Sequence, residues 1–221
     1  MLLAGVSSAD TFTVCASGCD YTSINEAINA ASAGDTIQLS AETYYEGSSV
    51  NINGDKTLKG AVDSEGLPAS IIDGQNLHRG IYKGGSTAYL ENLVVQNCIA
   101  INEPHDPIYG GAIWASGIMW IDNCIIRNNG GRMAGIYQVG GTLNMSNCIF
   151  EGNSSPAYAS CLSAYGGSIN VSFCDFRNNT TLSSSSAAVR VFASGVAHFS
   201  ATYIRNNSGH GFWNQFPNGN T

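Results

Sequence analysis

The chain has 221 residues, of which 16 are acidic and 9 are basic, so its formal net charge is −7. This charge argues against nucleic acid or an anionic membrane surface as the main partner. The chain also has no apolar run of the roughly 18 residues that a membrane span requires. We therefore expect no membrane span and no nucleic-acid partner, and the sequence contains no motif that predicts a cofactor.

The first residues, MLLAGVSSAD, resemble the end of a secretory signal, because a short apolar stretch precedes small residues. The stretch lacks a basic region and is short, so a disordered start is the alternative interpretation of residues 1–9. We expect a secreted or cell-surface protein in which residues 10–221 form a single domain, since one core can serve a chain of this length.

Seven cysteines favour an oxidising compartment, because a reducing cytosol would keep all of them as thiols. Cys15 and Cys19 enclose the three-residue turn ASG and are the best candidates for a disulfide. Two free thiols at these positions are the alternative.

The segment YTSINEAINAASAGDTIQL predicts one amphipathic helix at about residues 23–32. Its apolar residues recur at helical spacing, Thr22 or Ser23 is the N-cap, and Gly34 follows its end. We expect this helix to cover the open end of a repeat structure. The cap would then occupy about residues 10–34 and the coils about residues 35–221, beginning with the strand-like segments DTIQL, VNING, KTLKG and SIIDG.

A nine-residue unit occurs three times, as IDNCIIRNN at 121–129, MSNCIFEGN at 145–153 and VSFCDFRNN at 171–179. Aligned on its cysteine, the register extends to Leu93 and Thr202, with steps of 31, 24, 26 and 28 residues. A period of this size indicates a solenoid. Before each register position, apolar residues alternate with outward ones, which predicts a strand with one buried face.

A second strand precedes each unit and ends in glycines that mark a recurring bend. Its copies are GIYKGG at 80–85, GAIWASG at 111–117, GIYQVGG at 135–141, CLSAYGG at 161–167 and VRVFASG at 189–195. Each repeat therefore contains two or three short strands and no helix. Stacked coils of this kind predict an all-β fold, a single-stranded parallel β-helix with an N-terminal capping helix.

Two kinds of residue recur at fixed places in the register. Asparagines can form amide ladders that satisfy buried turn groups, whereas the cysteines predict an interior stack of thiols. Cysteine spacings of 24 and 26 lack the close pair of a zinc site, so we expect no metal. The asparagine columns are Asn92, Asn123 and Asn147, and Asn129, Asn153, Asn179 and Asn207; the cysteine column is Cys124, Cys148 and Cys174.

Short motifs also recur: GGAI at 110–113, FEGN at 150–153 and FRNN at 176–179. With them the chain resembles the pectin-lyase-like right-handed β-helix superfamily, and more narrowly the chlamydial polymorphic outer-membrane protein repeats, whose signatures are GGA[ILV] and FxxN. The resemblance implies right-handed coiling, but these motifs specify a coil and not an activity. Lyases of the superfamily use an acidic calcium site, whereas the matching outward column here supplies only Glu91 and Asp122.

Titratable residues gather in the loops that precede the glycine-ended strands of three successive coils. A histidine among carboxylates and arginines could act as a general base, so this cluster is the candidate catalytic site; a salt-bridged loop is the alternative. Its members are His78, Arg79, Glu103, His105, Asp106 and Arg132.

Aromatic residues form a second candidate site. Tyr82, Trp114 and Tyr137 each follow a buried isoleucine and should form one outward stack, with Tyr89 and Trp120 on the neighbouring strand. Such rings can bind sugar faces or another protein, or they can be strand-forming residues beneath a loop. The sequence leaves these three alternatives open.

Among several glycosylation sequons, Asn144 and Asn170 are the plausible acceptors because they should point outward. For the whole chain we expect a structural or adhesive protein that recognises glycan or protein, or that self-associates through its C-terminal coil. The alternative is a polysaccharide lyase or glycoside hydrolase that uses the His105 loop.

Overall fold

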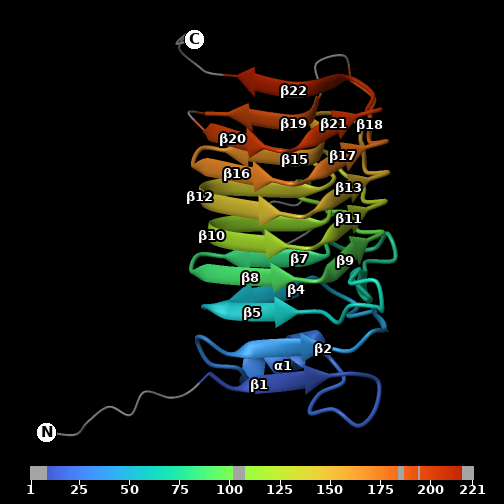
Figure 1. The fold of residues 1–221 in the computed structure, drawn as a ribbon, viewed down its shortest axis with the longest axis vertical. Helices are drawn as coiled ribbons and strands as arrows, with labels where there is room; N and C mark the ends of the chain where they lie inside the picture. The colour runs from blue at the N-terminus through green and yellow to red at the C-terminus, as the bar shows by residue number, and fades with distance from the viewer. Residues whose placement is uncertain (1–8, 102–107, 184–186, 194, 216–221) are drawn as a thin grey trace, which may run out of the picture.

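The computed structural model describes residues 9–101, 108–183, 187–193 and 195–215, and for 214–215 only the backbone. The strands lie on three faces of one stack of coils (Figure 1). We call these faces sheets 1, 2 and 3, although sheets 1 and 3 are parts of one 13-stranded parallel sheet, joined through the long strands β10 (Ile113–Asp122) and β12 (Ile136–Ser146). Glu103, His105 and Asp106 lie outside the described residues.

Sheet 1 carries the strands that lie just before each register position. Its members, in spatial order, are β1 (Thr11–Val14), β2 (Thr36–Leu39), β5 (Lys56–Lys59), β8 (Thr87–Glu91), the second halves of β10 (Ile113–Asp122) and β12 (Ile136–Ser146), β16 (Ser168–Ser172) and β20 (Val196–Ser200).

Sheet 2 carries the strands that follow the register position, and sheet 3 carries the glycine-ended strands. Sheet 2 consists of β3 (Thr43–Tyr44), β6 (Ser70–Asp73), β9 (Leu93–Gln96), β11 (Ile125–Arg127), β13 (Ile149–Glu151), β17 (Asp175–Arg177) and β21 (Tyr203–Arg205). Sheet 3 consists of β4 (Val50–Asn53), β7 (Ile81–Gly84), the first halves of β10 and β12, β15 (Ala159–Tyr165), β19 (Ala187–Phe192) and β22 (His210–Gln215); β14 (Ser154–Ser155) pairs with β18 (Thr180–Thr181) beside them.

Residues at the same repeat position are paired directly in neighbouring coils, for example Ile121 with Met145 and Met145 with Val171. These inward positions are at most 3% exposed, and they belong to one continuous apolar core. The predicted parallel β-helix is therefore confirmed.

The N-terminal helix α1 (Ile24–Ala30) packs against β1, β2 and β4, with its predicted apolar side buried. Ser23 is the N-cap, and its hydroxyl accepts from the backbone N–H of Glu26. The Glu46 carboxylate accepts from the Ser23 hydroxyl and from the first free N–H groups of the helix, which an anion stabilises. The predicted disulfide between Cys15 and Cys19 is present in the same region, with a Cα–Cα distance of 5.5 Å.

A continuous amide ladder runs beneath the turn that follows sheet 2. The side-chain Nδ2 of Asn129 donates to Asn153 Oδ1 at 3.0 Å, and Asn153 and Asn179 each repeat this bond to the next asparagine at 2.9 Å. Asn129, Asn153 and Asn179 are at most 1% exposed. The ladder has the role predicted for it, because its oxygens also accept the backbone N–H groups of the turn.

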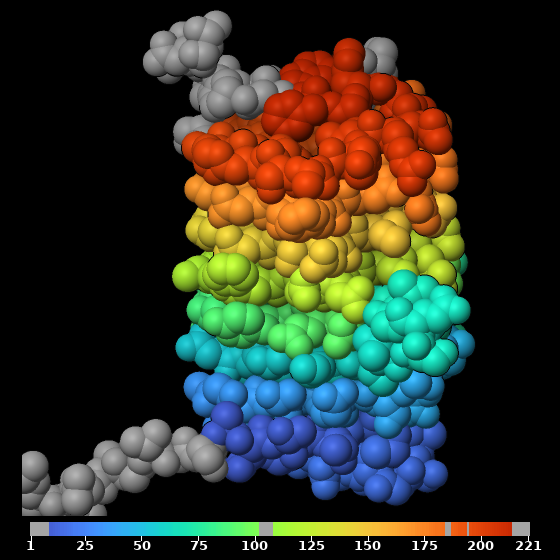
Figure 2. All heavy atoms as spheres, viewed as in Figure 1, coloured from blue at the N-terminus to red at the C-terminus, as the bar shows by residue number. Residues whose placement is uncertain are grey.

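The other asparagine column forms the predicted ladder only in part, since Asn123 Nδ2 donates to Asn92 Oδ1 at 2.8 Å but Asn147 Nδ2 donates to the Asp122 carboxylate instead. Its residues have a backbone role. Asn92, Asn123 and Asn147 adopt φ values of 57°, 48° and 55°, the left-handed region that asparagine tolerates better than most residues. One such residue turns the chain from sheet 1 into sheet 2. Beside this corner, the loop at 60–69 projects from the column (Figure 2) and Gly66 O accepts a hydrogen bond from Asn123 Nδ2.

The cysteine column lies inside, as predicted, and Cys124, Cys148 and Cys174 are at most 2% exposed. Each thiol donates to the carbonyl oxygen two residues before it, at 3.1 to 3.3 Å. Hydrogen bonding to the Cys124 thiol and burial raise the pKa of Cys148 well above its usual value. These thiols are therefore unreactive packing residues.

The bend between sheets 3 and 1 contains two buried polar side chains that the repeat pattern did not predict. Lys83 and Gln138 are fully buried, and their nitrogen atoms donate to bend carbonyls in their own and an adjacent coil. Burial lowers the pKa of Lys83 to about 8. At Gly141, where φ is 67°, an added Cβ would overlap the carbonyl oxygen of Gly117, so this position requires glycine.

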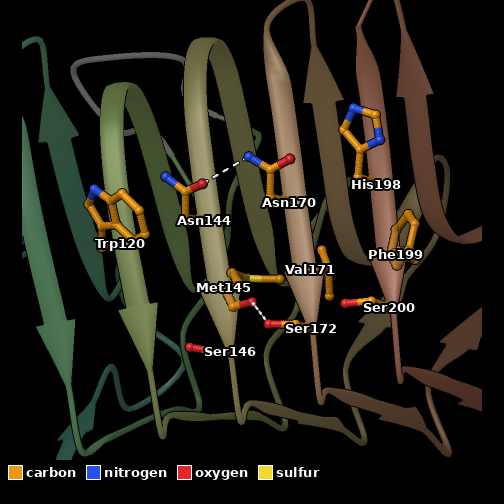
Figure 3. Close-up of a pocket in the computed structure, with 10 residues that line it drawn as sticks. All are labelled: Trp120, Asn144, Met145, Ser146, Asn170, Val171, Ser172, His198, Phe199 and Ser200. Atoms are coloured by element: carbon orange, nitrogen blue, oxygen red, sulfur yellow. Dashed lines mark hydrogen bonds between the residues drawn. The ribbon is translucent and has the colours of Figure 1, made fainter.

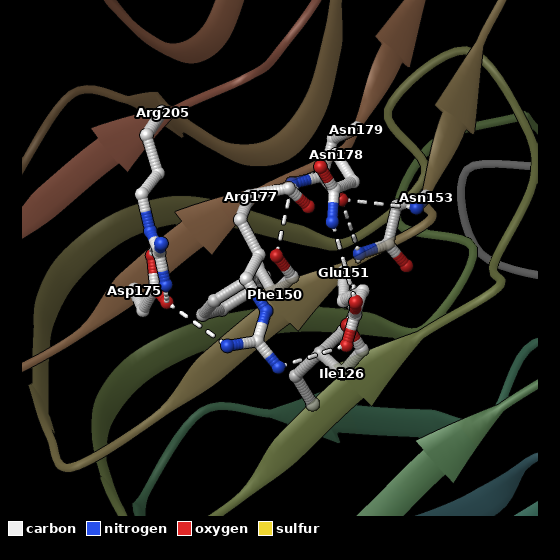
Figure 4. A network of polar contacts seen from close by, with 9 residues as sticks. All are labelled: Ile126, Phe150, Glu151, Asn153, Asp175, Arg177, Asn178, Asn179 and Arg205. Carbon is white, nitrogen blue, oxygen red and sulfur yellow. Dashed lines mark hydrogen bonds and ion pairs between the residues drawn. The ribbon is translucent and has the colours of Figure 1, made fainter.

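Ion pairs between neighbouring side chains lie on the outward face of the last three strands of sheet 2, β13, β17 and β21 (Figure 4). Arg177 contacts Glu151 at 3.1 Å and Asp175 at 3.2 Å, and Arg205 contacts Asp175 at 2.6 Å. The Arg177 guanidinium lowers the pKa of Glu151, and Arg205 lowers that of Asp175. Because these charges satisfy one another, the candidate binding surfaces lie on the other two sheets.

Candidate binding site

The outward face of sheet 3 carries the predicted aromatic stack. Tyr82 pairs with Trp114 and Trp114 with Tyr137 in the strand register, as expected. The rings of Tyr82 and Trp114 stack with centroids 4.8 Å apart and an angle of 14° between their planes. Tyr137 is only 7% exposed and meets Tyr109 edge to face, with centroids 5.2 Å apart.

The stack borders a pocket of about 320 Å³, which we call the sheet 3 pocket. Strands β12, β15 and β19 provide its floor, and the segments before β10 and β15 provide Tyr109 and Tyr158 at its side. No carboxylate belongs to its described lining. The lining residues are Tyr109, Met133, Tyr137, Tyr158, Tyr165, Arg190 and Phe192.

Arg190 is surrounded by aromatic rings. Its guanidinium carbon lies 5.0 Å from the ring centroid of Tyr158, 5.3 Å from that of Phe192 and 5.6 Å from that of Trp213. Arg132 approaches the Tyr158 ring at 5.2 Å. Ring faces attract and partly desolvate a guanidinium, which strengthens its interaction with an anion that enters the pocket.

Ser163 contributes a hydroxyl to the same strand layer. It pairs with Tyr137 on one side and with Arg190 on the other, it is fully buried, and its Oγ has no hydrogen-bond partner among the described residues. Buried hydroxyls are normally satisfied.

The predicted catalytic cluster is only partly described. Arg79 is 1% exposed, and its guanidinium donates to the carbonyl oxygens of Gly110 and Tyr109, both at 3.0 Å. His78 is 8% exposed, and its Nδ1 lies 2.8 Å from the carbonyl oxygen of Arg79. Arg79 therefore fastens one coil to the next, whereas Arg132 is exposed beside the sheet 3 pocket.

The remaining predicted residues lie on sheet 1. Tyr89 and Trp120 are 42% and 47% exposed, and their rings are nearly parallel with centroids 6.4 Å apart. Asn144 and Asn170 follow them in the same outward column, joined by a hydrogen bond of 2.8 Å between their side chains. Their use as glycosylation sites stays a prediction.

No group of three or more His, Cys, Asp and Glu side chains within the described part of the chain is arranged to hold a metal ion. No described helix is long and apolar enough to cross a bilayer.

Comparison with known proteins agrees with this architecture. The sequence profile described as "Right handed beta helix region" matches residues 4–176. The chain belongs to the right-handed β-helix family.

Some solved structures are similar to the chain at low identity. A pectin methylesterase from Aspergillus niger is 14% identical with a TM-score of 0.49, and the match covers 92% of this chain and 87% of that one. The pectin methylesterase PemA from Erwinia chrysanthemi is also 14% identical, with a TM-score of 0.47 and coverage of 90% and 68%. Similarity at this level carries no information about activity, and no curated protein matches the chain.

Some residues that line the sheet 3 pocket of this right-handed β-helix were not predicted from the sequence. Tyr165 and Phe192 face outward because they pair with each other two places after Ser163 and Arg190. Both lie in segments that the sequence assigns to strands, so their alternation was a usable signal. Tyr109 and Tyr158 lie in connecting segments, where no periodicity could place them.

Proposed function

We propose that this protein is an extracellular, non-catalytic glycan-binding β-helix, and that the sheet 3 pocket binds a sugar unit bearing a carboxylate. The observation that carries the proposal is Arg190, held among the rings of Tyr158, Phe192 and Trp213 at the edge of a tyrosine-lined pocket. Rings of this kind bind the apolar faces of sugars, and a guanidinium binds a carboxylate with two parallel hydrogen bonds.

The size of the pocket favours a glycan over a folded protein partner. A volume of about 320 Å³ falls in the range of small-molecule pockets, whereas a stable protein interface buries about 800 Å² on each side. The charge of the protein supports the same choice. Arg190 lines the pocket, Arg132 lies beside it over the Tyr158 ring, and no carboxylate is among the described lining residues, although the chain has a net charge of −7.

Two further features support an extracellular adhesive role. The Cys15–Cys19 disulfide is typical of an oxidising compartment. The GGAI and FxxN repeats resemble those of chlamydial polymorphic outer-membrane proteins.

Isothermal titration with acidic and neutral oligosaccharides of equal length tests the pocket. We expect a uronic-acid oligomer to bind more tightly than its neutral counterpart. Arg190→Gln should remove this preference, and Tyr158→Ala should weaken binding about tenfold, because it removes a ring that contacts two arginines. Tyr203→Ala is the matched control, since Tyr203 is 69% exposed on sheet 2. Equal affinity for both oligomers would refute the acidic-sugar assignment.

The enzymatic alternative rests on the His105 loop, which lies outside the described residues. A screen of polysaccharides for new reducing ends or unsaturated products tests it. Cleavage that His105→Ala and Arg132→Ala abolish would establish an enzyme and overturn the non-catalytic proposal.

Self-association is a second candidate function, favoured by the last coils. Inward residues that are fully buried in the middle coils become partly exposed at Phe199 and Ile204, and Phe212 is 43% exposed. Among the described strands, none pairs with the outer edges of β20 and β21. Sedimentation velocity over a hundredfold range of concentration tests this role, and a monomer throughout would exclude it.

A further inference from the structure

A second hollow lies on the outward face of sheet 1, away from the sheet 3 pocket. It is a trough of about 260 Å³ across β12 and β16, with Trp120 at one end and His198 at the other (Figure 3). Asn144, Asn170 and outward serines form its floor. We infer that this trough binds a neutral, hydroxyl-rich sugar, as a site separate from the acidic-sugar pocket.

Trp120 provides the stacking surface. One face of its indole is turned toward Tyr89, with ring centroids 6.4 Å apart and planes 11° from parallel. Asn144, the next residue in the column, lies on the other side of Trp120 from Tyr89, and Trp120 itself lines the trough (Figure 3). At 47% exposure the ring has room for an apolar sugar face.

The floor of the trough provides both a hydrogen-bond donor and a hydrogen-bond acceptor. Asn170 Nδ2 donates to Asn144 Oδ1 at 2.8 Å, which fixes the direction of the amide pair. Asn144 Nδ2 then remains as a donor on the Trp120 side, and Asn170 Oδ1 remains as an acceptor on the His198 side; neither has a partner within the described residues. Sugar hydroxyls can both donate and accept, so they match a floor that presents one of each.

The lining explains why the ligand is neutral. No Lys, Arg, Asp or Glu belongs to it. The nearby Asp122 carboxylate already accepts from Ser146 Oγ at 2.6 Å and from Asn147 Nδ2 at 2.9 Å. An anionic sugar would find no arginine or lysine here, in contrast to the sheet 3 pocket. From Trp120 to His198 the column advances three strand spacings, about 14 Å, which accommodates one or two sugar rings.

Titration with neutral gluco-, manno- and xylo-trisaccharides tests the site, with protein made in a host that glycosylates neither Asn144 nor Asn170. We expect at least one of them to bind, and Trp120→Ala to weaken that binding at least about tenfold. Ser172→Leu, which fills the floor while keeping the ring, should weaken it too. Arg190→Gln and Tyr203→Ala should leave it within twofold.

Each contrary outcome overturns the inference. If no neutral trisaccharide binds, or if Trp120→Ala and Ser172→Leu bind like wild type, the trough is not a sugar site. If Arg190→Gln abolishes neutral binding, the sugar occupies the sheet 3 pocket instead. Because the acidic-oligomer titration reports on Arg190 and this one on Trp120, either site can fail while the other stands.

Discussion

Replacing one rung of the asparagine ladder should destabilise the protein far more than a typical polar substitution. Asn153 is fully buried, its Oδ1 accepts from both the backbone N–H and the Nδ2 of Asn129, and its Nδ2 donates to Ile126 O and Asn179 Oδ1. In Asn153→Ala the backbone N–H of Asn129 loses this acceptor inside the protein. A buried N–H group without an acceptor lowers the free energy of unfolding by about 1–3 kcal/mol, and the loss of each of the other three hydrogen bonds lowers it by about 0.5–1.5 kcal/mol.

These contributions amount to about 4 kcal/mol, which corresponds to a Tm lower by roughly 8–16 °C in a protein of this size. Urea and thermal unfolding followed by circular dichroism measure the effect. Asn51→Ala is the control, because Asn51 is exposed on β4 and its side chain donates only to the carbonyl oxygen of Ser49. If Asn153→Ala and Asn51→Ala unfold within about 1 kcal/mol of each other, the ladder does not hold the coils together as argued.

Three further predictions concern the interior. Because burial lowers the pKa of Lys83 from 10.5 to about 8, the unfolded chain holds a proton at this side chain that the folded chain has released between these values. The contribution of Lys83 to stability should therefore rise with pH across this window, so the free energy of urea unfolding of wild type should gain on that of Lys83→Met as the pH rises, and a difference that does not change with pH would contradict the burial of Lys83. The five buried free thiols should react with Ellman's reagent at pH 8 only after unfolding, so rapid labelling of native protein would contradict the thiol stack. Gly141→Ala should lower stability by more than about 1 kcal/mol and more than Gly140→Ala, since both glycines have positive φ but only Gly141 lacks space for a Cβ.

The repeat pattern predicted the coils because inward and outward residues alternate in the same way in every repeat, and stacking places equivalent residues of successive repeats side by side. Inward residues such as Met145 and Val171 recur at one register position, and the amides of Asn129 and Asn153 recur at another. The N-terminal helix could also be predicted from the sequence, because Ser23 and the spacing of the apolar residues mark its start. A repeat of 24 to 31 residues was therefore enough to predict most of the fold.

Features that depend on a single coil could not be predicted in this way. Lys83 and Gln138 occupy inward positions where the pattern predicts apolar residues, because each donates to bend carbonyls of its own coil and of one neighbouring coil. The sheet 3 pocket brings Arg190 to Tyr158 across the stack, a contact that depends on the paths of connecting segments. The sequence found Trp120 and Asn144 separately, but it could not show that they line one trough.

The most direct test of the proposed function is the salt dependence of uronic-acid oligomer binding to wild-type protein and to Arg190→Gln, measured by isothermal titration. The account predicts that wild-type affinity falls as ionic strength rises, and that Arg190→Gln binds more weakly with a smaller salt dependence. Binding that is insensitive to salt and unchanged in Arg190→Gln would contradict the claim that the ring-enclosed arginine recognises an acidic sugar.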